Sequence, residues 1–279
     1  MVTMDAEPNA VQITTTPEGI TTITIDRRHR RNAVDSHTAR KLYRAFLAFE
    51  DDPTQKVCIL HGAHGTFCAG ADLHQLSQME QDQPDATDGS RLQRVDGRNL
   101  GPMGPSRLQV RKPVISAVAG HAVAGGLELS LMADMRVVEE DAIFGVFCRR
   151  WGVPLIDGGT VRLQAIVGLG RALDMILTGR PVGAQEALTM GLANRVVPRG
   201  KALEEATVMA KQLLAFPQGC MLADRNSCYY SAYTASSFED ALKQEYDAGV
   251  KVIYTESVHG AAKFSGGAGR HGSFNRSKL

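Results

Sequence analysis

Short segments that alternate apolar and polar residues, separated by turn residues, open the chain. Residues 11–16 and 20–25 alternate on either side of a Pro-Glu-Gly turn, a pattern that predicts a β-hairpin. After a basic segment at 27–31, apolar residues recur at helical spacing and predict a helix capped by Asp35 or Ser36. This stripe comprises Ala39, Leu42, Tyr43, Phe46 and Leu47.

Strands and helices are predicted to alternate through the middle of the chain. Four short apolar runs predict strands at 57–60, 113–118, 136–139 and 142–144. Residues 78–107 interrupt this pattern because they are polar and lack a strong period, which predicts a long mobile loop with short helical pieces. The short links between strands and helices predict an α/β fold with crossover units.

The pattern becomes mainly helical from residue 159 onward. Apolar positions at helical spacing predict helices over 161–167, 171–177, 184–190 and 206–214. A last helix is predicted to begin at Ser236-Ser237-Phe238-Glu239, which resembles a capping box. We therefore expect a core at 1–200 and a C-terminal helical region at 201–279 that serves self-association.

Composition narrows the functional classes. The chain has 279 residues, 43% of them hydrophobic and 22% charged, which is enough to bury a sizeable core. A net charge of +1 gives no footprint for nucleic acid or for an anionic membrane. The five cysteines lack paired CxxC spacing, so neither a disulfide framework nor a metal site is expected. With a polar N-terminus, these features predict a cytoplasmic protein.

One run of small and apolar residues, 119–128, carries a lone carboxylate behind two glycines. If Gly125 opens a helix, its N–H group lacks an intrahelical partner, and Glu128 follows three residues later on the same face. A free N–H beside a partly buried carboxylate can hold a developing oxyanion and move a proton. A second interpretation stays open at this point, in which the glycines allow close packing and Glu128 is a paired core acid.

Several other segments, in the same order along the chain, resemble the enoyl-CoA hydratase/isomerase family, also called the crotonase superfamily. Residues 66–73 are similar to its first oxyanion loop, and 119–134, with the Gly-Gly-x-Glu-Leu core, to its second. Residues 144–163 and 177–197 resemble the segments that follow. Arg31-Asn32-Ala33 is similar to an early turn that contacts coenzyme A, and the whole resemblance runs from about residue 11 to 260.

This resemblance implies a spiral of ββα turns with a C-terminal helical region, assembled as trimers or as dimers of trimers. It also implies an acyl-CoA substrate and no cofactor besides the coenzyme A of that substrate. The backbone N–H groups of Ala71 and Gly125 would form the oxyanion hole. Contacts to coenzyme A are implied for Arg31, Ala33, Ala69, Asp72 and Leu73.

The catalytic residues depart from the family pattern at one position. Glu128 matches one of the two catalytic glutamates of family hydratases, but Cys148 stands where the second is expected. Hydration with two carboxylates uses one to activate water and one to protonate the α-carbon. Glu128 therefore performs both steps, or Asp157 reaches the site from the adjoining loop, where it is otherwise a helix N-cap, or the reaction is another one.

The sequence thus predicts an enoyl-CoA hydratase-like enzyme that acts through an enolate. The alternatives are another crotonase-type reaction, namely isomerisation, hydrolysis or decarboxylation with Asp157 or Cys148 taking part, and a non-catalytic acyl-CoA-binding protein.

Overall fold

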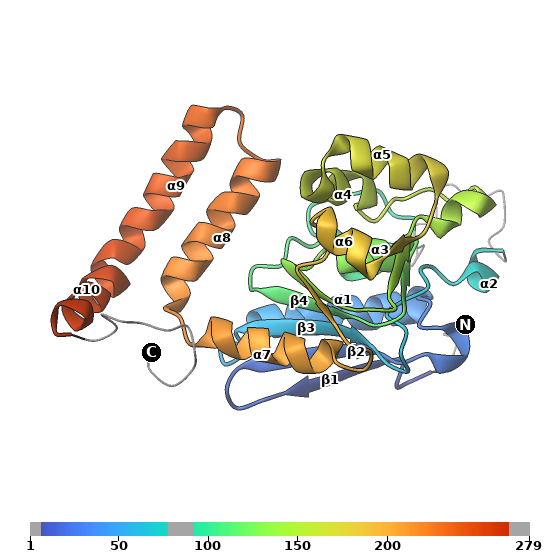
Figure 1. Cartoon of the computed structure of the whole chain (residues 1–279), viewed down its shortest axis with the longest axis horizontal. Helices are drawn as coiled ribbons and strands as arrows, with labels where there is room; N and C mark the ends of the chain where they lie inside the picture. Colours follow the sequence, from blue (N-terminus) through green and yellow to red (C-terminus); the bar gives the residue numbers. More distant parts are fainter. Residues whose placement is uncertain (1–6, 78–91, 268–279) are drawn as a thin grey trace. The chain divides into compact units, whose positions relative to one another are not determined.

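The computed structural model describes residues 7–77 and 92–267. The chain divides into two compact units, residues 1–210 and 211–279. The first unit carries two β-sheets with helices around them, and the second is helical, so the predicted α/β class is confirmed (Figure 1). Part of the predicted polar loop, 78–91, and most of the glycine-rich tail, 268–279, lie outside the described residues.

A six-stranded sheet forms the base of the first unit, in the order β1-β2-β3-β4-β6-β9. The hairpin predicted from the alternating N-terminal segments is present, with Val11 opposite Ile25, and all other neighbours in this sheet are parallel. Its strands are β1 Val11–Thr15, β2 Ile20–Ile25, β3 Val57–Gly62, β4 Val114–Val118, β6 Met135–Glu139 and β9 Arg195–Val197.

Three later strands form a second, smaller sheet. It contains β5 His121–Val123, β7 Ile143–Gly145 and β8 Val182–Gly183, in that order. Because β4 is followed by β5 and then a helix, and β6 by β7 and then further helices, the chain alternates between the two sheets as it advances. This alternation produces the expected spiral of ββα turns.

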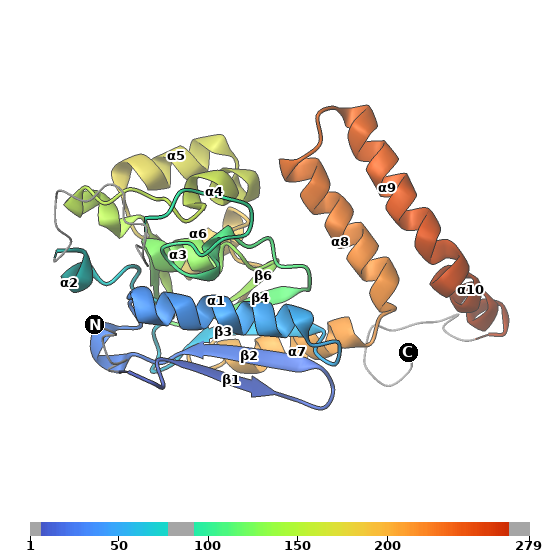
Figure 2. The same cartoon turned by 180° about the vertical axis from the view of Figure 1, so that it is seen from behind.

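Helices cover the sheets of the first unit. Asp35 caps α1 by accepting a hydrogen bond from the Thr38 N–H at 2.7 Å, and α1 runs along strands β1 and β2 with its apolar face buried (Figure 2). The α-helices are α1 Ser36–Asp51, α2 Leu73–Leu76, α3 Gly125–Ser130, α4 Gly159–Val167, α5 Leu169–Thr178, α6 Ala184–Thr189 and the start of α7 Ala202–Leu214. Short 3-10 turns lie at Arg28–Arg30, Pro105–Arg107 and Phe147–Trp151.

The second unit contains one helix that the sequence pattern predicted, α9 Phe238–Val252, and two that it did not, α8 Gln218–Tyr233 and α10 Val258–Ser265. Helices α8 and α9 lie side by side, and a π-helical turn, Ile253–Ser257, leads into α10 (Figure 1). α8 was missed because it lacks a clear apolar stripe. The cap of α9 is also one residue later than predicted, since Ser237 accepts a hydrogen bond from the Asp240 N–H at 3.1 Å.

A buried arginine joins three segments near the first oxyanion loop. The Arg27 guanidinium is 3.0 Å from the Asp35 carboxylate and 3.2 Å from that of Asp72, and it also pairs with Glu7. Asp72 in turn accepts a hydrogen bond from the His74 N–H and so caps α2. This cluster fixes the start of α1 and the start of α2 relative to each other.

Backbone hydrogen bonds join the two loops that resemble the family's oxyanion loops. The Cys68 N–H donates to the His121 carbonyl at 2.9 Å, and the Val123 N–H donates to the Cys68 carbonyl at 3.1 Å. The loops approach so closely that a Cβ atom on Gly126 would lie 2.0 Å from the Cys68 oxygen. Glycine at 126 is therefore required for this junction.

We expect Gly126→Ala to lower the free energy of unfolding by about 1–3 kcal/mol or more, because the added methyl group must displace backbone atoms. Gly170→Ala is the matched control, since Gly170 lies in α5 with open space around its Cα. There alanine is expected to leave stability unchanged or to raise it by about 0.5–1 kcal/mol. Urea unfolding of both variants measures the difference, and equal stabilities would contradict the packing argument.

Candidate active site

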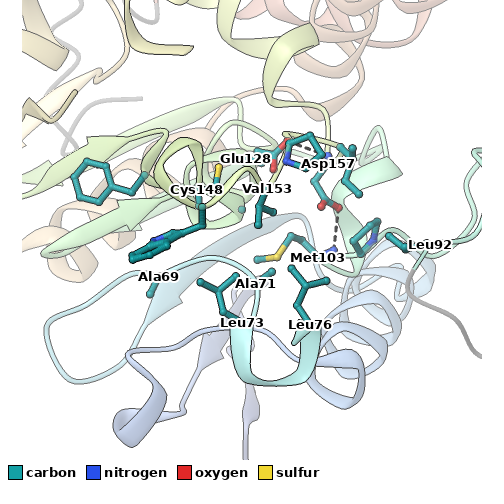
Figure 3. A pocket seen from close by; sticks show the side chains of 17 residues that line it. Ala69, Ala71, Leu73, Leu76, Leu92, Met103, Glu128, Cys148, Val153 and Asp157 are labelled. Carbon is teal, nitrogen blue, oxygen red and sulfur yellow. Dashed lines mark hydrogen bonds between the residues drawn. The ribbon is translucent and has the colours of Figure 1, made fainter. Parts of the chain in front are cut away.

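A pocket opens in the first unit where the joined loops face the segment 147–157 (Figure 3). It encloses about 810 Å³ of empty space, including the part open to solvent. Its polar side chains are Glu128, Cys148 and Asp157, and much of the remaining wall is apolar. The larger apolar groups in that wall are Leu73, Leu76, Met103, Phe147, Trp151 and Ile156.

The two predicted oxyanion-hole residues, Ala71 and Gly125, both line this pocket. Gly125 begins α3 as predicted, and Ala124 before it adopts the unusual backbone angles φ +53° and ψ −125°. Within the described part of the chain, neither N–H group donates a hydrogen bond to the protein. The two loops touch here, since a Cβ atom on Gly70 would lie 3.0 Å from the Gly125 nitrogen. Two residues whose N–H groups have no partner among the described residues therefore line the same pocket.

Glu128 is oriented by two backbone donors. Its side chain is buried, and its Oε1 atom accepts hydrogen bonds from the Asp157 N–H at 2.9 Å and the Gly159 N–H at 2.8 Å. A Cβ atom on Gly159 would lie 2.8 Å from the Glu128 Cγ, so glycine is needed for this approach. In residues 7–77 and 92–267, no cation forms a salt bridge with Glu128 and its Oε2 atom accepts no hydrogen bond. One carboxylate oxygen is thus fixed, while the other stays available.

Burial is the main influence on the charge of Glu128. Desolvation, and to a smaller extent the nearby Asp157 carboxylate, raise the pKa of this carboxyl group to about 7. The two backbone hydrogen bonds and the Arg162 guanidinium act in the opposite direction and do not cancel the increase. A carboxyl group that titrates near neutrality can both accept and donate a proton there.

Asp157 lies beside Glu128 in the same pocket (Figure 3). It is not the N-cap of the following helix, because α4 is capped by Gly158 without any side-chain hydrogen bond. Instead its Oδ1 atom accepts hydrogen bonds from the Met103 N–H at 2.9 Å and from the Ser106 hydroxyl. The helix-cap alternative for Asp157 is therefore wrong.

Cys148 also faces the pocket, from the 3-10 turn Phe147–Trp151. Its side chain is buried, and both burial and the Glu128 carboxylate raise the pKa of the thiol above its ordinary value of 9.0. At neutral pH the sulfur therefore keeps its proton and is a poor general base. All three predicted catalytic residues share one pocket, but their environments differ.

The residues predicted to contact coenzyme A divide into two groups. Ala69 and Leu73 line the pocket. Arg31 lies at a separate polar depression that it shares with Arg28 and His64. Ala33 and Asp72 are buried, and the Asp72 carboxylate is already paired with Arg27. These contacts stay predictions.

Met103 and Ser106 were missed by the sequence analysis, which placed them in an irregular polar loop. Met103 is fully buried against the site, and Ser106 holds Asp157. The available signal was the sequence Gly101-Pro-Met-Gly-Pro105, because closely spaced glycine and proline residues mark a defined turn.

Trp151 stands at the pocket wall with 71% of its surface exposed. Beside it, Arg150 lies over the Phe147 ring at 4.8 Å from the ring centroid.

Within residues 7–77 and 92–267, no group of His, Cys, Asp and Glu side chains is arranged to hold a metal ion. The helices in the described ranges are also too short or too polar to cross a membrane.

Two curated relatives match most of the chain in sequence. A relative named enoyl-CoA hydratase EchA19, from Mycobacterium tuberculosis, is 36% identical over 200 residues, which are 69% of this chain and 70% of the relative. A carnitinyl-CoA dehydratase from Proteus mirabilis is 33% identical over 247 residues, covering 88% of this chain and 89% of the relative.

Solved structures and the family's sequence model point the same way. The crystal structure of an enoyl-CoA hydratase from M. tuberculosis superposes with a TM-score of 0.81 at 30% identity, covering 92% of this chain and 96% of that one. The sequence model of the enoyl-CoA hydratase/isomerase family matches residues 15–264. The chain therefore belongs to the enoyl-CoA hydratase/isomerase, or crotonase, family.

Proposed function

We propose that this protein catalyses the reversible addition of water to an enoyl-CoA thioester, with Glu128 as its one proton-transfer side chain. The observation that carries the proposal is the state of the Glu128 carboxyl group: Oε1 is held by two backbone N–H groups, and Oε2 accepts no hydrogen bond in the described part of the chain. A pKa of about 7 suits a group that must accept a proton and then return it.

Both steps of the proposed reaction use the same carboxylate. Ionised Glu128 removes a proton from water as the water oxygen bonds to the substrate β-carbon. The electron pair of the carbon–carbon double bond moves to the thioester oxygen and forms an enolate. Glu128 then donates the proton to the α-carbon, the enolate collapses to the thioester, and the carboxylate returns to its starting state. Water is added with no net proton left over.

The backbone N–H groups of Ala71 and Gly125 bind the thioester oxygen in this scheme. The charge on that oxygen grows as the enolate forms, so preorganised donors stabilise the transition state more than the neutral substrate. Neither donor must first break a hydrogen bond within the described protein, which supports this role.

Cys148 takes no proton in this scheme. The raised pKa of its thiol disfavours both general-base catalysis and nucleophilic attack at neutral pH. That favours hydration by one carboxylate over a reaction that begins with a thiolate. The names of two relatives, an enoyl-CoA hydratase and a carnitinyl-CoA dehydratase, both describe the gain or loss of water by a CoA thioester and support the same choice.

The wider functional setting follows from the same proposal. The apolar wall of the pocket supports an apolar acyl group on the thioester, and the reaction needs no cofactor besides the substrate's coenzyme A. We also propose self-association as a trimer or a dimer of trimers. Exposed apolar side chains on α9, including Phe238 and Tyr246, support it. The cytoplasmic location stays a prediction.

Glu128→Gln is expected to lower kcat for enoyl-CoA hydration by about 10²–10⁴-fold, because the amide cannot transfer the proton. The amide oxygen still accepts both backbone hydrogen bonds, so folding and binding are expected to persist. Loss of the conjugated enoyl absorbance measures the rate, with short-chain and long-chain thioesters as substrates. Equal rates in the variant and the wild type would remove Glu128 from the mechanism.

Cys148→Ala is expected to change kcat by less than about tenfold, since this thiol is protonated and transfers no proton. The same assay measures the effect, and calorimetric binding of a saturated acyl-CoA controls for a damaged pocket. A loss as large as that of Glu128→Gln, with binding intact, would assign chemistry to the thiol.

Glu128→Gln is also expected to change how stability depends on pH. The pKa of Glu128 lies at about 7 in the folded protein and above its ordinary 4.5, so the folded state binds this proton more tightly. The resulting stabilisation is complete below about pH 4.5 and is lost as pH rises through about 7. Above pH 7 the free energy of unfolding of the variant should exceed that of the wild type by up to about 3 kcal/mol. Urea unfolding at pH 5 and pH 8 tests this, and an equal difference at both would contradict it.

A further inference from the structure

Asp157 is a buried pocket carboxylate that the proposed reaction does not use. Its backbone N–H donates to Glu128 Oε1 at 2.9 Å. Its Oδ1 atom accepts hydrogen bonds from the Met103 N–H at 2.9 Å and from the Ser106 hydroxyl. One residue therefore connects the proton-transfer group to a distant segment of the chain.

That segment, residues 101–106, is a closed turn. Gly101 and Gly104 exchange two backbone hydrogen bonds, at 2.9 and 2.8 Å. The turn carries Met103, whose fully buried side chain covers Gly125: a Cβ atom on Gly125 would lie 2.6 Å from the Met103 sulfur. The turn held by Asp157 thus packs directly against the N-terminus of α3, where one proposed oxyanion donor lies.

The contacts of Asp157 argue against proton exchange with substrate. Two donors on one oxygen stabilise the ionised form of a carboxyl group. Both donors, the Met103 N–H and the Ser106 hydroxyl, are buried with Asp157. These hydrogen bonds therefore favour an ionised Asp157 beside Glu128.

We propose that Asp157, held by Ser106, is a positioning residue that locks Glu128 and the Met103 turn into one arrangement and keeps a fixed negative charge next to Glu128. The inference rests on the proposed function for its effect on turnover. Its effect on Glu128 does not require substrate. The charged groups that act on Glu128 are Asp157 and Arg162, and Glu128 in turn raises the pKa of the Cys148 thiol.

Asp157→Asn separates the charge from the geometry. Asparagine keeps the backbone N–H that binds Glu128, and its side-chain oxygen can accept from Met103 and Ser106. The charge is lost, so ionisation of Glu128 becomes easier and its pKa is expected to fall by about one unit. The acidic limb of kcat/KM moves to lower pH by the same amount.

Ser106→Ala and Tyr43→Phe provide the comparison. Ser106→Ala keeps the charge at 157 but removes a hydrogen bond to it, so kcat is expected to fall several-fold, at roughly unchanged KM, because Ser106 does not line the pocket. The Tyr43 hydroxyl donates to the Arg98 carbonyl at 2.8 Å and so anchors a residue shortly before the 101–106 turn to α1, without contacting Asp157. In Tyr43→Phe, both the pKa of Glu128 and the turnover are expected to equal those of the wild type.

The experiment is a pH titration of the full chain with ¹³C-labelled glutamate carboxyl groups, followed by NMR without substrate, alongside pH profiles of kcat and KM. The Glu128 resonance is the one missing in Glu128→Gln. A lower Glu128 midpoint in Asp157→Asn and an unchanged midpoint in Tyr43→Phe are the expected results. An unchanged midpoint in Asp157→Asn overturns the proposal, as does a loss of kcat in that variant as deep as in Glu128→Gln.

Failure of the two proposals can be told apart. If the wild type does not hydrate enoyl-CoA thioesters, the proposed function fails, while the NMR titration still tests the action of Asp157 on Glu128. If Asp157→Asn does not fold, Ser106→Ala decides: a fall in kcat at constant KM supports positioning, and wild-type kcat overturns it.

Discussion

The arrangement of the site depends on one short backbone junction, between Cys68 of the first loop and His121 and Val123 of the second. These hydrogen bonds span a short distance in space, but the residues that they join lie far apart in the sequence. Gly126 makes the junction possible by leaving room for the Cys68 carbonyl. Ala71 of the first loop and Gly125 of the second then line one pocket, and α3, which begins at Gly125, carries Glu128 into it.

Electrostatics then decide what the pocket can do. A buried carboxyl group beside a second carboxylate is harder to ionise, and this raises the pKa of Glu128 to about 7. Cys148 stands where the resemblance to the family led us to expect a second glutamate, and in the proposed reaction Glu128 performs both proton transfers. The surroundings of Glu128 support that proposal, because they give its carboxyl group a pKa of about 7.

Local patterns in the sequence predicted much of the fold and several site residues. The Asp35 cap, the N-terminal hairpin and the helix that begins at Gly125 depend on neighbours in the chain, so their signals are local. Of the two interpretations of the double glycine, the close packing is found at Gly126, whereas Glu128 has no cationic partner among the described residues. The bonds from Met103 and Ser106 to Asp157 join residues about fifty positions apart, and no local pattern encodes them. Helix α8 was not predicted because it has no clear apolar stripe.

Trp151 has a consequence for observing this molecule. It is the single tryptophan of the chain, and its largely exposed indole belongs to the pocket wall. Most soluble proteins distribute their tryptophans, so that emission averages over unrelated environments. Here the whole intrinsic indole emission originates at the wall of one pocket, and the polarity around that ring sets its wavelength. The protein thus contains a built-in optical reporter at the place where chemistry is proposed.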